Sequence, residues 1–199
     1  MEALVRVVSR YIAAGALAAV SLAPHAQPPS PVADQSYVAA DGTRVLQQSA
    51  LVPAGSADVW NAFVTSDGFA SWAAPVAFVD FRLGGFIEAT YDPNGKIGAP
   101  GNIKNEIVAF VPQRMLAIRN TQAPPSTAFD APTFQKLHTV IFFDPLSAAT
   151  TRVTIVQPGF GTGEKFDGVY THFARGNAWS LQQLVNRFAE GRAKWPKAP

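Results

Sequence analysis

The sequence predicts an α+β domain in which an antiparallel sheet of about six strands precedes one long C-terminal helix. Three observations lead to this fold class. Apolar residues recur at helical spacing near the C-terminus, and the runs between residues 76 and 157 alternate with a period of two. Two short helical segments also separate the first strand from the later ones. The expected order is therefore strand, two short helices, several strands and a final helix.

The final helix is expected from about Glu164 to Glu190, which is longer than the usual ~11–12 residues. One polar residue, Asn177, interrupts its apolar stripe and follows Gly176. Because a mid-helix glycine costs about 1 kcal/mol relative to alanine, we expect a packing or cavity reason for it. The alternative is a kink at which Asn177 caps local backbone groups. The stripe consists of Phe166, Val169, Tyr170, Phe173, Leu181, Leu184 and Phe188.

The elements before the sheet have recognisable boundaries. A first strand is expected over Tyr37–Val52, broken at Asp41-Gly42 and closed by Pro53. Ser56 is expected to cap a short helix that contains Trp60, because serine is favoured at that position. A second short helical turn is expected over 65–73.

The next two strands are expected to form a hairpin. Residues 76–83 and 86–91 flank Gly84-Gly85, a two-residue turn signal. This register places Phe81 opposite Glu88 and puts Glu88 on the same face as Val79, Phe81, Leu83 and Phe86.

Four further strands are expected. Residues 102–111 and 114–120 would place Glu106 opposite Arg119 as a cross-strand ion pair. A long loop over 121–136 separates them from strands at 137–143 and 150–157, which are joined through Asp144-Pro145.

The N-terminus predicts export. Residues 1–26 resemble a signal peptide, with Arg6 and Arg10 before an apolar core and a cleavage site after Ala26 or Ala23. An uncleaved anchor is the alternative. Residues 27–36 then form a Pro-rich linker, 37–192 the domain and 193–199 a C-terminal tail. We therefore expect a periplasmic or secreted protein with no stable membrane span after the leader is removed.

Composition argues against several functions. The chain has 16 basic and 14 acidic residues, a formal charge of +2, so nothing favours nucleic acid. It has no cysteine, and only His138 and His172 follow the leader, so no metal or cofactor is expected. The segment 159–166 lacks the Gly-Lys-Ser/Thr ending of a phosphate-binding loop.

Several short motifs resemble the SRPBCC (START-like, helix-grip) superfamily, over about residues 38–191. The closest branch is named after the activator of the heat-shock-protein-90 ATPase and overlaps the polyketide cyclase and dehydratase group. The resemblance implies a sheet of about six or seven strands wrapped around the C-terminal helix, with a cavity between them for a hydrophobic or amphipathic ligand. The matching motifs are Val59-Trp60, Trp72 with Pro75, 80–85, 106–116, 159–161, Phe173, Gly176-Asn177, Leu181, Leu184, Arg187-Phe188 and Gly191.

On this fold, aromatic side chains are expected to line the cavity and polar groups to orient the ligand. Glu88 could instead pair with an arginine or reach solvent, and Glu106–Arg119 could be a structural ion pair. His138 could be an edge residue near the cavity mouth, and His172 is expected to be exposed. The ligand-binding candidates are Trp72, Phe81, Phe86, Glu88, Arg119, His138, Phe142, Phe160, Tyr170, Phe173 and Asn177.

Three functions remain open. The first is an exported binding protein for a small hydrophobic ligand. The second is a cyclase or dehydratase in which Glu88 or His138 moves protons, although no catalytic residue can be assigned. The third is a protein-interaction module, against which the export signal argues. A homodimer is also open. Trp179, on the opposite face of the final helix, could form a dimer contact or cover a loop.

Overall fold

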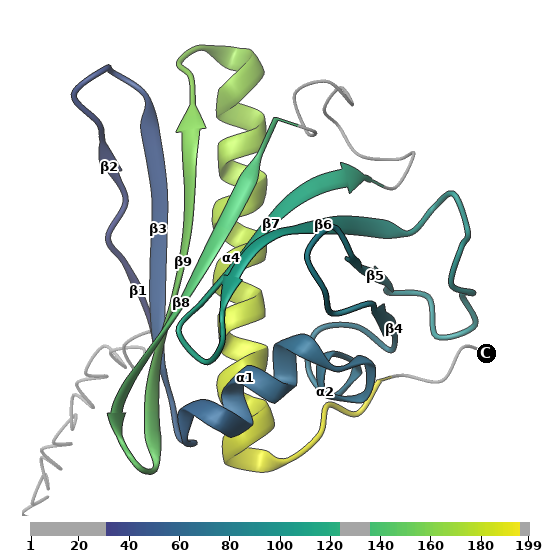
Figure 1. Ribbon diagram of the computed structural model, residues 1–199. Coiled ribbons are helices and arrows are strands. Elements are labelled where there is room, and N and C mark those ends of the chain that lie inside the picture. The colour runs from purple at the N-terminus through teal and green to yellow at the C-terminus, as the bar shows by residue number, and fades with distance from the viewer. Residues whose placement is uncertain (1–30, 124–135, 196–199) are drawn as a thin grey trace, which may run out of the picture.

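A computed structural model describes residues 31–123 and 136–195. A nine-stranded antiparallel sheet curves around the long C-terminal helix α4 (Figure 1). The strand order is β1-β3-β9-β8-β7-β6-β5-β4, and β2 also pairs with β3. The elements are β1 Val32–Asp34, β2 Tyr37–Val38, β3 Arg44–Val52, α1 Ser56–Val64, α2 Ser66–Ala70, β4 Val76–Val79, β5 Phe86–Thr90, β6 Ile103–Val111, β7 Met115–Gln122, β8 His138–Ser147, β9 Thr150–Phe160 and α4 Glu164–Glu190.

The fold class is confirmed, and α4 has the bounds that the apolar stripe predicts. The sheet has nine strands, more than the six or seven expected. Two of the additional strands arise at the N-terminal edge. Tyr37–Val52 divides into β2 and β3, and β1 forms at Val32–Asp34, within the segment predicted to be a linker. None of the described helices is long and apolar enough to cross a membrane.

One hydrophobic core cluster fills the end of the molecule where α1 and α2 meet α4. Trp60, Phe63 and Phe143 form its aromatic centre, with the Phe143 ring edge-on to both others at 5.3 and 5.0 Å. Leu181 and Leu184 from the C-terminal half of α4 complete it and are almost fully buried. Helices α1 and α2 connect β3, near one edge of the sheet, with β4 at the other edge. They therefore close this end of the sheet.

A second, smaller cluster lies near the N-terminal half of α4. It consists of Leu46, Leu137, Phe160 and Val169, with Tyr170 and Phe173 packed against it. The buried stripe of α4 therefore carries bulky side chains at both ends. Between them lie Gly176 and Asn177, the two residues that interrupt the stripe in the sequence.

The expected β4–β5 hairpin is wrong in register. Phe78 pairs with Glu88 and Val79 with Ile87, and the chain leaves β4 after Val79. The two glycines serve a longer loop in place of a two-residue turn. Gly84 has φ +72°, and a Cβ on Gly85 would lie only 2.0 Å from the Asp80 carbonyl oxygen. The shift reverses the expected faces, so Ile87 and Ala89 lie on the inner side and Phe86 and Glu88 on the outer.

Smaller boundary predictions also differ. The N-cap of α1 is Gly55, since Ser56 makes no capping bond and instead lies 3.4 Å from Gln113. The cap at the start of α2 is the Thr65 hydroxyl, which accepts a hydrogen bond from the Gly68 backbone. Strands β8 and β9 continue past Pro145, because a register irregularity between Pro145 and Ser147 accommodates the proline.

Candidate functional site

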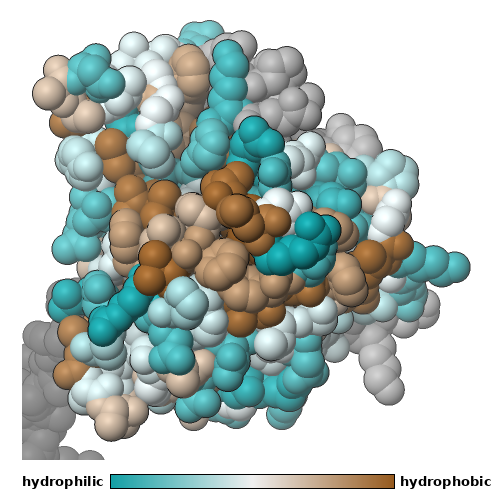
Figure 2. Space-filling view, in the orientation of Figure 1, coloured by the Kyte–Doolittle hydropathy of each residue, from teal (hydrophilic) through white to brown (hydrophobic). Residues whose placement is uncertain are grey.

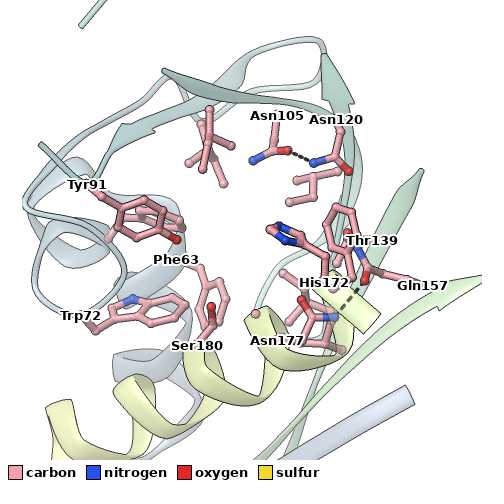
Figure 3. Close-up of a pocket in the computed structure, with 18 residues that line it drawn as sticks. Phe63, Trp72, Tyr91, Asn105, Asn120, Thr139, Gln157, His172, Asn177 and Ser180 are labelled. Atoms are coloured by element: carbon pink, nitrogen blue, oxygen red, sulfur yellow. Dashed lines mark hydrogen bonds between the residues drawn. The ribbon is translucent and has the colours of Figure 1, made fainter. Parts of the chain in front are cut away.

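A cavity of about 390 Å³ lies between the two core clusters, with α4 on one side and the sheet on the other (Figure 3). Its position follows from the helix stripe, because the cavity occupies the part of α4 that lacks bulky apolar residues. Most of the wall is aromatic or aliphatic. The lining residues are Phe63, Phe69, Trp72, Ile87, Tyr91, Ile103, Asn105, Ile118, Asn120, Thr139, Ile141, Ile155, Gln157, His172, Phe173, Gly176, Asn177 and Ser180.

Gly176 keeps the helix side of the cavity open. Gly176 is exposed and lines the cavity, and a Cβ atom built on it would have no neighbour within 4 Å, so a larger side chain would meet open space at the edge of the cavity. The glycine is not needed for backbone conformation, because α4 continues through it as regular helix. Of the two reasons expected for this glycine, close packing or a cavity, the structure supports the cavity.

Asn177 begins a chain of hydrogen bonds along the cavity wall. Its Nδ2 donates to Gln157 Oε1 at 2.8 Å, and Gln157 Nε2 donates to Thr139 Oγ1 at 2.8 Å. Gln157 and Thr139 are buried and project from the inner faces of β9 and β8. The bond to Gln157 replaces the alternative in which Asn177 caps the helix backbone.

A second pair of amides lies on the far wall. Asn120 Nδ2 of β7 donates to Asn105 Oδ1 of β6 at 2.7 Å. Asn120 is 6% exposed, yet its Oδ1 has no hydrogen-bond partner among the described residues. Leaving a buried acceptor unpaired costs about 1–3 kcal/mol, so this wall can gain from a donor on an occupant.

Tyr91 and His172 add the only titratable side chains to the described cavity wall. A tyrosine phenol is protonated at neutral pH, so the Tyr91 hydroxyl, on a side chain that is 56% exposed, can donate a hydrogen bond at the rim of the cavity. The Tyr91 ring also meets Trp179 edge-on at 6.0 Å on the exterior of α4. The Trp179 side chain thus contacts the β5–β6 connection, and it remains 41% exposed.

A buried carboxylate positions that connection. Glu88 is 2% exposed, and its Oε1 accepts hydrogen bonds from the backbone of Gly98 and from Asn102 Nδ2 at 2.6 Å. Lys104 Nζ lies 3.8 Å from the other carboxylate oxygen. Glu88 is thus buried and paired, as a structural residue would be, on the opposite face of β5 from the cavity.

Three of the eleven predicted ligand-binding residues line the cavity: Trp72, Phe173 and Asn177. Trp72 presents an apolar ring there, because its Nε1 is already occupied by the Ala62 carbonyl at 2.8 Å. The other eight lie elsewhere, and each is placed there by strand parity or by core packing.

Five of the predicted aromatic residues lie outside this cavity. Phe81 packs on Trp60 and Phe110 beside the first cluster, and Phe86 packs on Phe78 below Lys104. Phe142 is 40% exposed on the outer face, since only Thr139, Ile141 and Phe143 of β8 point inwards. Phe160 and Tyr170 pack edge-on in the second cluster, beyond the end of the cavity.

The polar predictions Glu88, Arg119 and His138 are also outside the cavity. The expected pairing of Glu106 with Arg119 is confirmed, and the two side chains form an ion pair. His138 of β8 is the cross-strand neighbour of Arg119 and is exposed. This row lies on the outer face, opposite Asn105, Asn120 and Thr139.

Sequence reasoning missed the amides and His172. The alternation of β6, β7 and β8 fixes which residues share a face but not which face is inner, so Asn105, Asn120 and Thr139 could not be selected. His172 is exposed, as expected, yet it reaches the cavity (Figure 3). Its spacing to Gly176 and Ser180 is the four-residue helical repeat, which was the available signal.

The described residues contain no group of three or more side chains placed to hold a metal ion. The wall offers aromatic rings, aliphatic groups, amides, hydroxyls and the His172 imidazole. Such a lining is typical of a site that encloses a small apolar molecule and orients it by a few hydrogen bonds.

Comparison with known proteins agrees with this architecture. A family model described as "Activator of Hsp90 ATPase homolog 1-like protein" matches residues 53–189. Comparison with curated protein sequences finds no match.

Three solved structures illustrate the likeness of fold. The Aha1 dimer from Colwellia psychrerythraea is 12% identical, with a TM-score of 0.57 over 75% of this chain and 98% of that one. CalU16 from Micromonospora echinospora is 14% identical, with a TM-score of 0.56 over 84% and 88%. Ms6760 from Mycobacterium smegmatis is 20% identical, with a TM-score of 0.55 over 78% and 95%. At these identities the likeness concerns the fold.

Proposed function

Because the chain belongs to the family of Activator of Hsp90 ATPase homolog 1-like proteins, whose helix-grip fold serves more than one function, we propose a function from the cavity. The chain binds a small hydrophobic or amphipathic ligand between the sheet and α4. The observation that carries this proposal is the cavity of about 390 Å³ that interrupts the core at Gly176 and Asn177. Its volume falls in the range of about 300–1,000 Å³ found for ligand pockets.

The cavity opens to solvent beside Tyr91 and His172, which are both exposed, so a small ligand can enter it. Gly176 leaves room for a larger side chain at this edge, and the chain keeps that space open.

An enzyme of the cyclase or dehydratase type is the alternative. Glu88 and His138, the acid and base considered from the sequence, both lie outside the cavity wall. His172 is the remaining base candidate, and the protonated Tyr91 phenol could polarise a carbonyl. This alternative requires turnover that is lost in His172→Phe, whereas a binding protein would keep its ligand in that variant.

We also propose export, with residues 1–26 as the leader. The experiment that tests both proposals is to express the whole chain, purify it from the periplasm, and compare native with denaturing mass spectra. We expect a mature protein without its leader, and a small molecule that is lost on denaturation. An intact leader would contradict export, and a native mass equal to the denatured mass would contradict a tightly held ligand.

A homodimer formed through the outer sheet face is a further proposal. Val111, Met115 and Phe142 are cross-strand neighbours there, and Val111 and Phe142 are 50% and 40% exposed. Figure 2 shows a band of hydrophobic surface across the middle of one face of the molecule. A second copy is the proposed partner, because a protein of the same fold was solved as a dimer.

This proposal predicts that the wild type is dimeric in solution and that Val111→Glu is monomeric. A charge at this position would have to be desolvated in the interface without a partner, whereas in the monomer it stays in water. Light scattering coupled to gel filtration gives both masses. Arg82→Glu, a charge change at an exposed loop residue away from this row, is the control. A monomeric wild type would contradict the proposal.

A further inference from the structure

Another pocket lies outside the cavity, where α1 and α2 meet the C-terminal end of α4 (Figure 1). Its volume is about 290 Å³. Phe69 and Trp72 line the cavity. Gly68 and Ser71, their neighbours in the chain, line this other pocket. The segment around α2 therefore separates the two spaces, which share no lining residue.

This polar pocket carries two charged side chains of each sign, namely Asp58, Asp67, Arg187 and Arg192. Two of them satisfy one another, because Arg192 Nη1 donates to Asp67 Oδ2 and Arg192 Nη2 donates to Asp67 Oδ1, both at 2.8 Å. The hydrogen bonds from Arg192 hold the pKa of the Asp67 carboxyl below its usual range, so this pair stays ionised and closed. Arg187 and Asp58 are the charges that remain for an occupant.

The Arg187 guanidinium is oriented by a buried hydroxyl. Its Nε donates to Ser71 Oγ at 2.9 Å, and that hydroxyl donates to the Gly68 carbonyl at 2.6 Å. Ser71 is 2% exposed, so it fixes the direction of the half-buried arginine. Among the described residues, Nη1 and Nη2 have no hydrogen-bond or ion-pair partner. A guanidinium whose two terminal nitrogens are available can bind a carboxylate through two parallel hydrogen bonds.

Asp58 supplies the opposite charge at another part of the polar pocket. It is exposed in the first turn of α1, and its carboxylate forms no ion pair or hydrogen bond with any described residue, Arg187 included. Ala62, which also lines the pocket, lies one helical turn further along α1, a rise of ~5.4 Å. Gly68 packs against Ala62 at that point, so the Arg187 group tied to the Gly68 carbonyl lies beyond Asp58 along the pocket.

We propose that the polar pocket binds a small zwitterion of the α-amino acid class, with the ligand carboxylate on the Arg187 fork and the ligand ammonium on Asp58. Because the charges of the pocket sum to zero, a ligand with a single charge would leave one of these two groups unpaired. Ala62 and Phe188 add apolar surface, which suits an aliphatic side chain. The site is independent of the ligand proposed for the cavity, since the two share no residue.

Three probes with the same branched carbon chain test the need for both charges. L-Leucine carries both, 4-methylpentanoate lacks the ammonium, and 3-methylbutylamine lacks the carboxylate. In ¹H–¹⁵N titrations of the whole protein, leucine is expected to shift the backbone signals of Gly68 and Ser71. It should bind at least about fivefold more tightly than either singly charged probe, which is the upper range for an exposed ion pair.

Arg187→Met tests the carboxylate fork. Methionine keeps an apolar stem against Phe188 but has no donor, so leucine binding is expected to weaken at least about tenfold. Arg175→Met is the matched control, because Arg175 is an exposed arginine of α4 that does not line the polar pocket. This control should bind leucine as the wild type does. Urea unfolding of both variants shows whether the loss of the Ser71 contact has changed stability.

Asp58→Asn tests the ammonium site through a comparison made within one variant. Asp58 is exposed, so the fold does not depend on its carboxylate. Leucine should lose its advantage over 4-methylpentanoate in this variant, to within about twofold, because the ammonium no longer meets an anion. Asp144→Asn, a change at an exposed aspartate of β8 outside the pocket, should keep the preference of the wild type.

Equal affinity of the wild type for leucine and 4-methylpentanoate would overturn the proposed zwitterion class. Leucine binding that leaves the signals of Gly68 and Ser71 unchanged would overturn the site, as would a complete absence of leucine binding. A preference for leucine that survives in Asp58→Asn would contradict the role of Asp58. None of these outcomes bears on the cavity, which is judged by the ligand mass in the native spectrum.

Discussion

Gly176→Phe is expected to abolish ligand binding without destabilising the protein. Gly176 is exposed at the edge of the cavity, and a Cβ atom there would have no neighbour within 4 Å, so a phenylalanine is expected to occupy the opening without a clash. The helix also gains, because most residues are more favourable than glycine in a helix interior, by about 0.5 kcal/mol for phenylalanine. Affinity should fall at least about 100-fold, which corresponds to about 2.8 kcal/mol.

Gly168→Phe is the matched control for this substitution. Gly168 also lies on α4, is exposed and is open around its Cβ position, as Gly176 is, but it does not line the cavity. This variant should show the same helix effect and unchanged affinity. Calorimetry with the ligand, together with urea unfolding, separates the two effects. Unchanged affinity in Gly176→Phe would mean that the ligand binds elsewhere.

Phe143→Ala is expected to lower the free energy of unfolding by about 3–5 kcal/mol, as for other large-to-small substitutions in cores. Phe143 is completely buried and its ring meets Trp60 and Phe63 edge-on at 5.3 and 5.0 Å. Truncation would remove the centre of the aromatic cluster, which α1 and β8 build together. The loss is a large part of the stability of an ordinary domain.

Phe142→Ala provides the comparison from the adjacent residue. Phe142 faces outwards and is 40% exposed, so its truncation should cost less than about 1 kcal/mol. Both substitutions are made in the background of the Val111→Glu variant, which is expected to be monomeric, so that self-association does not affect the measured stability. Urea unfolding followed by tryptophan fluorescence gives both values. Equal losses would contradict the assignment of inner and outer faces on β8.

The sequence predicts the long helix most reliably, because its stripe repeats over many turns. The bounds of α4 agree with that pattern, and the break at Gly176 and Asn177 marks the cavity. Both residues conflict with a packed helix face, which is why they indicate a site. The pairing of Glu106 with Arg119 is also predictable, from the two strands around Pro112-Gln113.

Most of the site is not predictable, because it depends on which face of each strand is inner. The chemistry of Phe142 and His138 favours them as site residues, although Thr139 and Ile141 hold the inner positions. On β5 a different register exchanges the faces of Glu88 and Ile87. That register depends on the loop at Gly84 and Gly85, whose backbone hydrogen bonds with Ile107 of β6 are non-local.

Isoleucine methyl groups allow the most direct test of cavity binding. Five of them line the space, from Ile87, Ile103, Ile118, Ile141 and Ile155, whereas Ile97 and the fully buried Ile107 do not. With ¹³C-labelled isoleucine methyls, titration with the small molecule identified by the native mass spectrum is expected to shift the five lining signals and to give intermolecular NOEs to them. The signals of Ile97 and Ile107 should stay close to their positions in the free protein. Binding that leaves the five lining signals unchanged would contradict a ligand site between the sheet and α4.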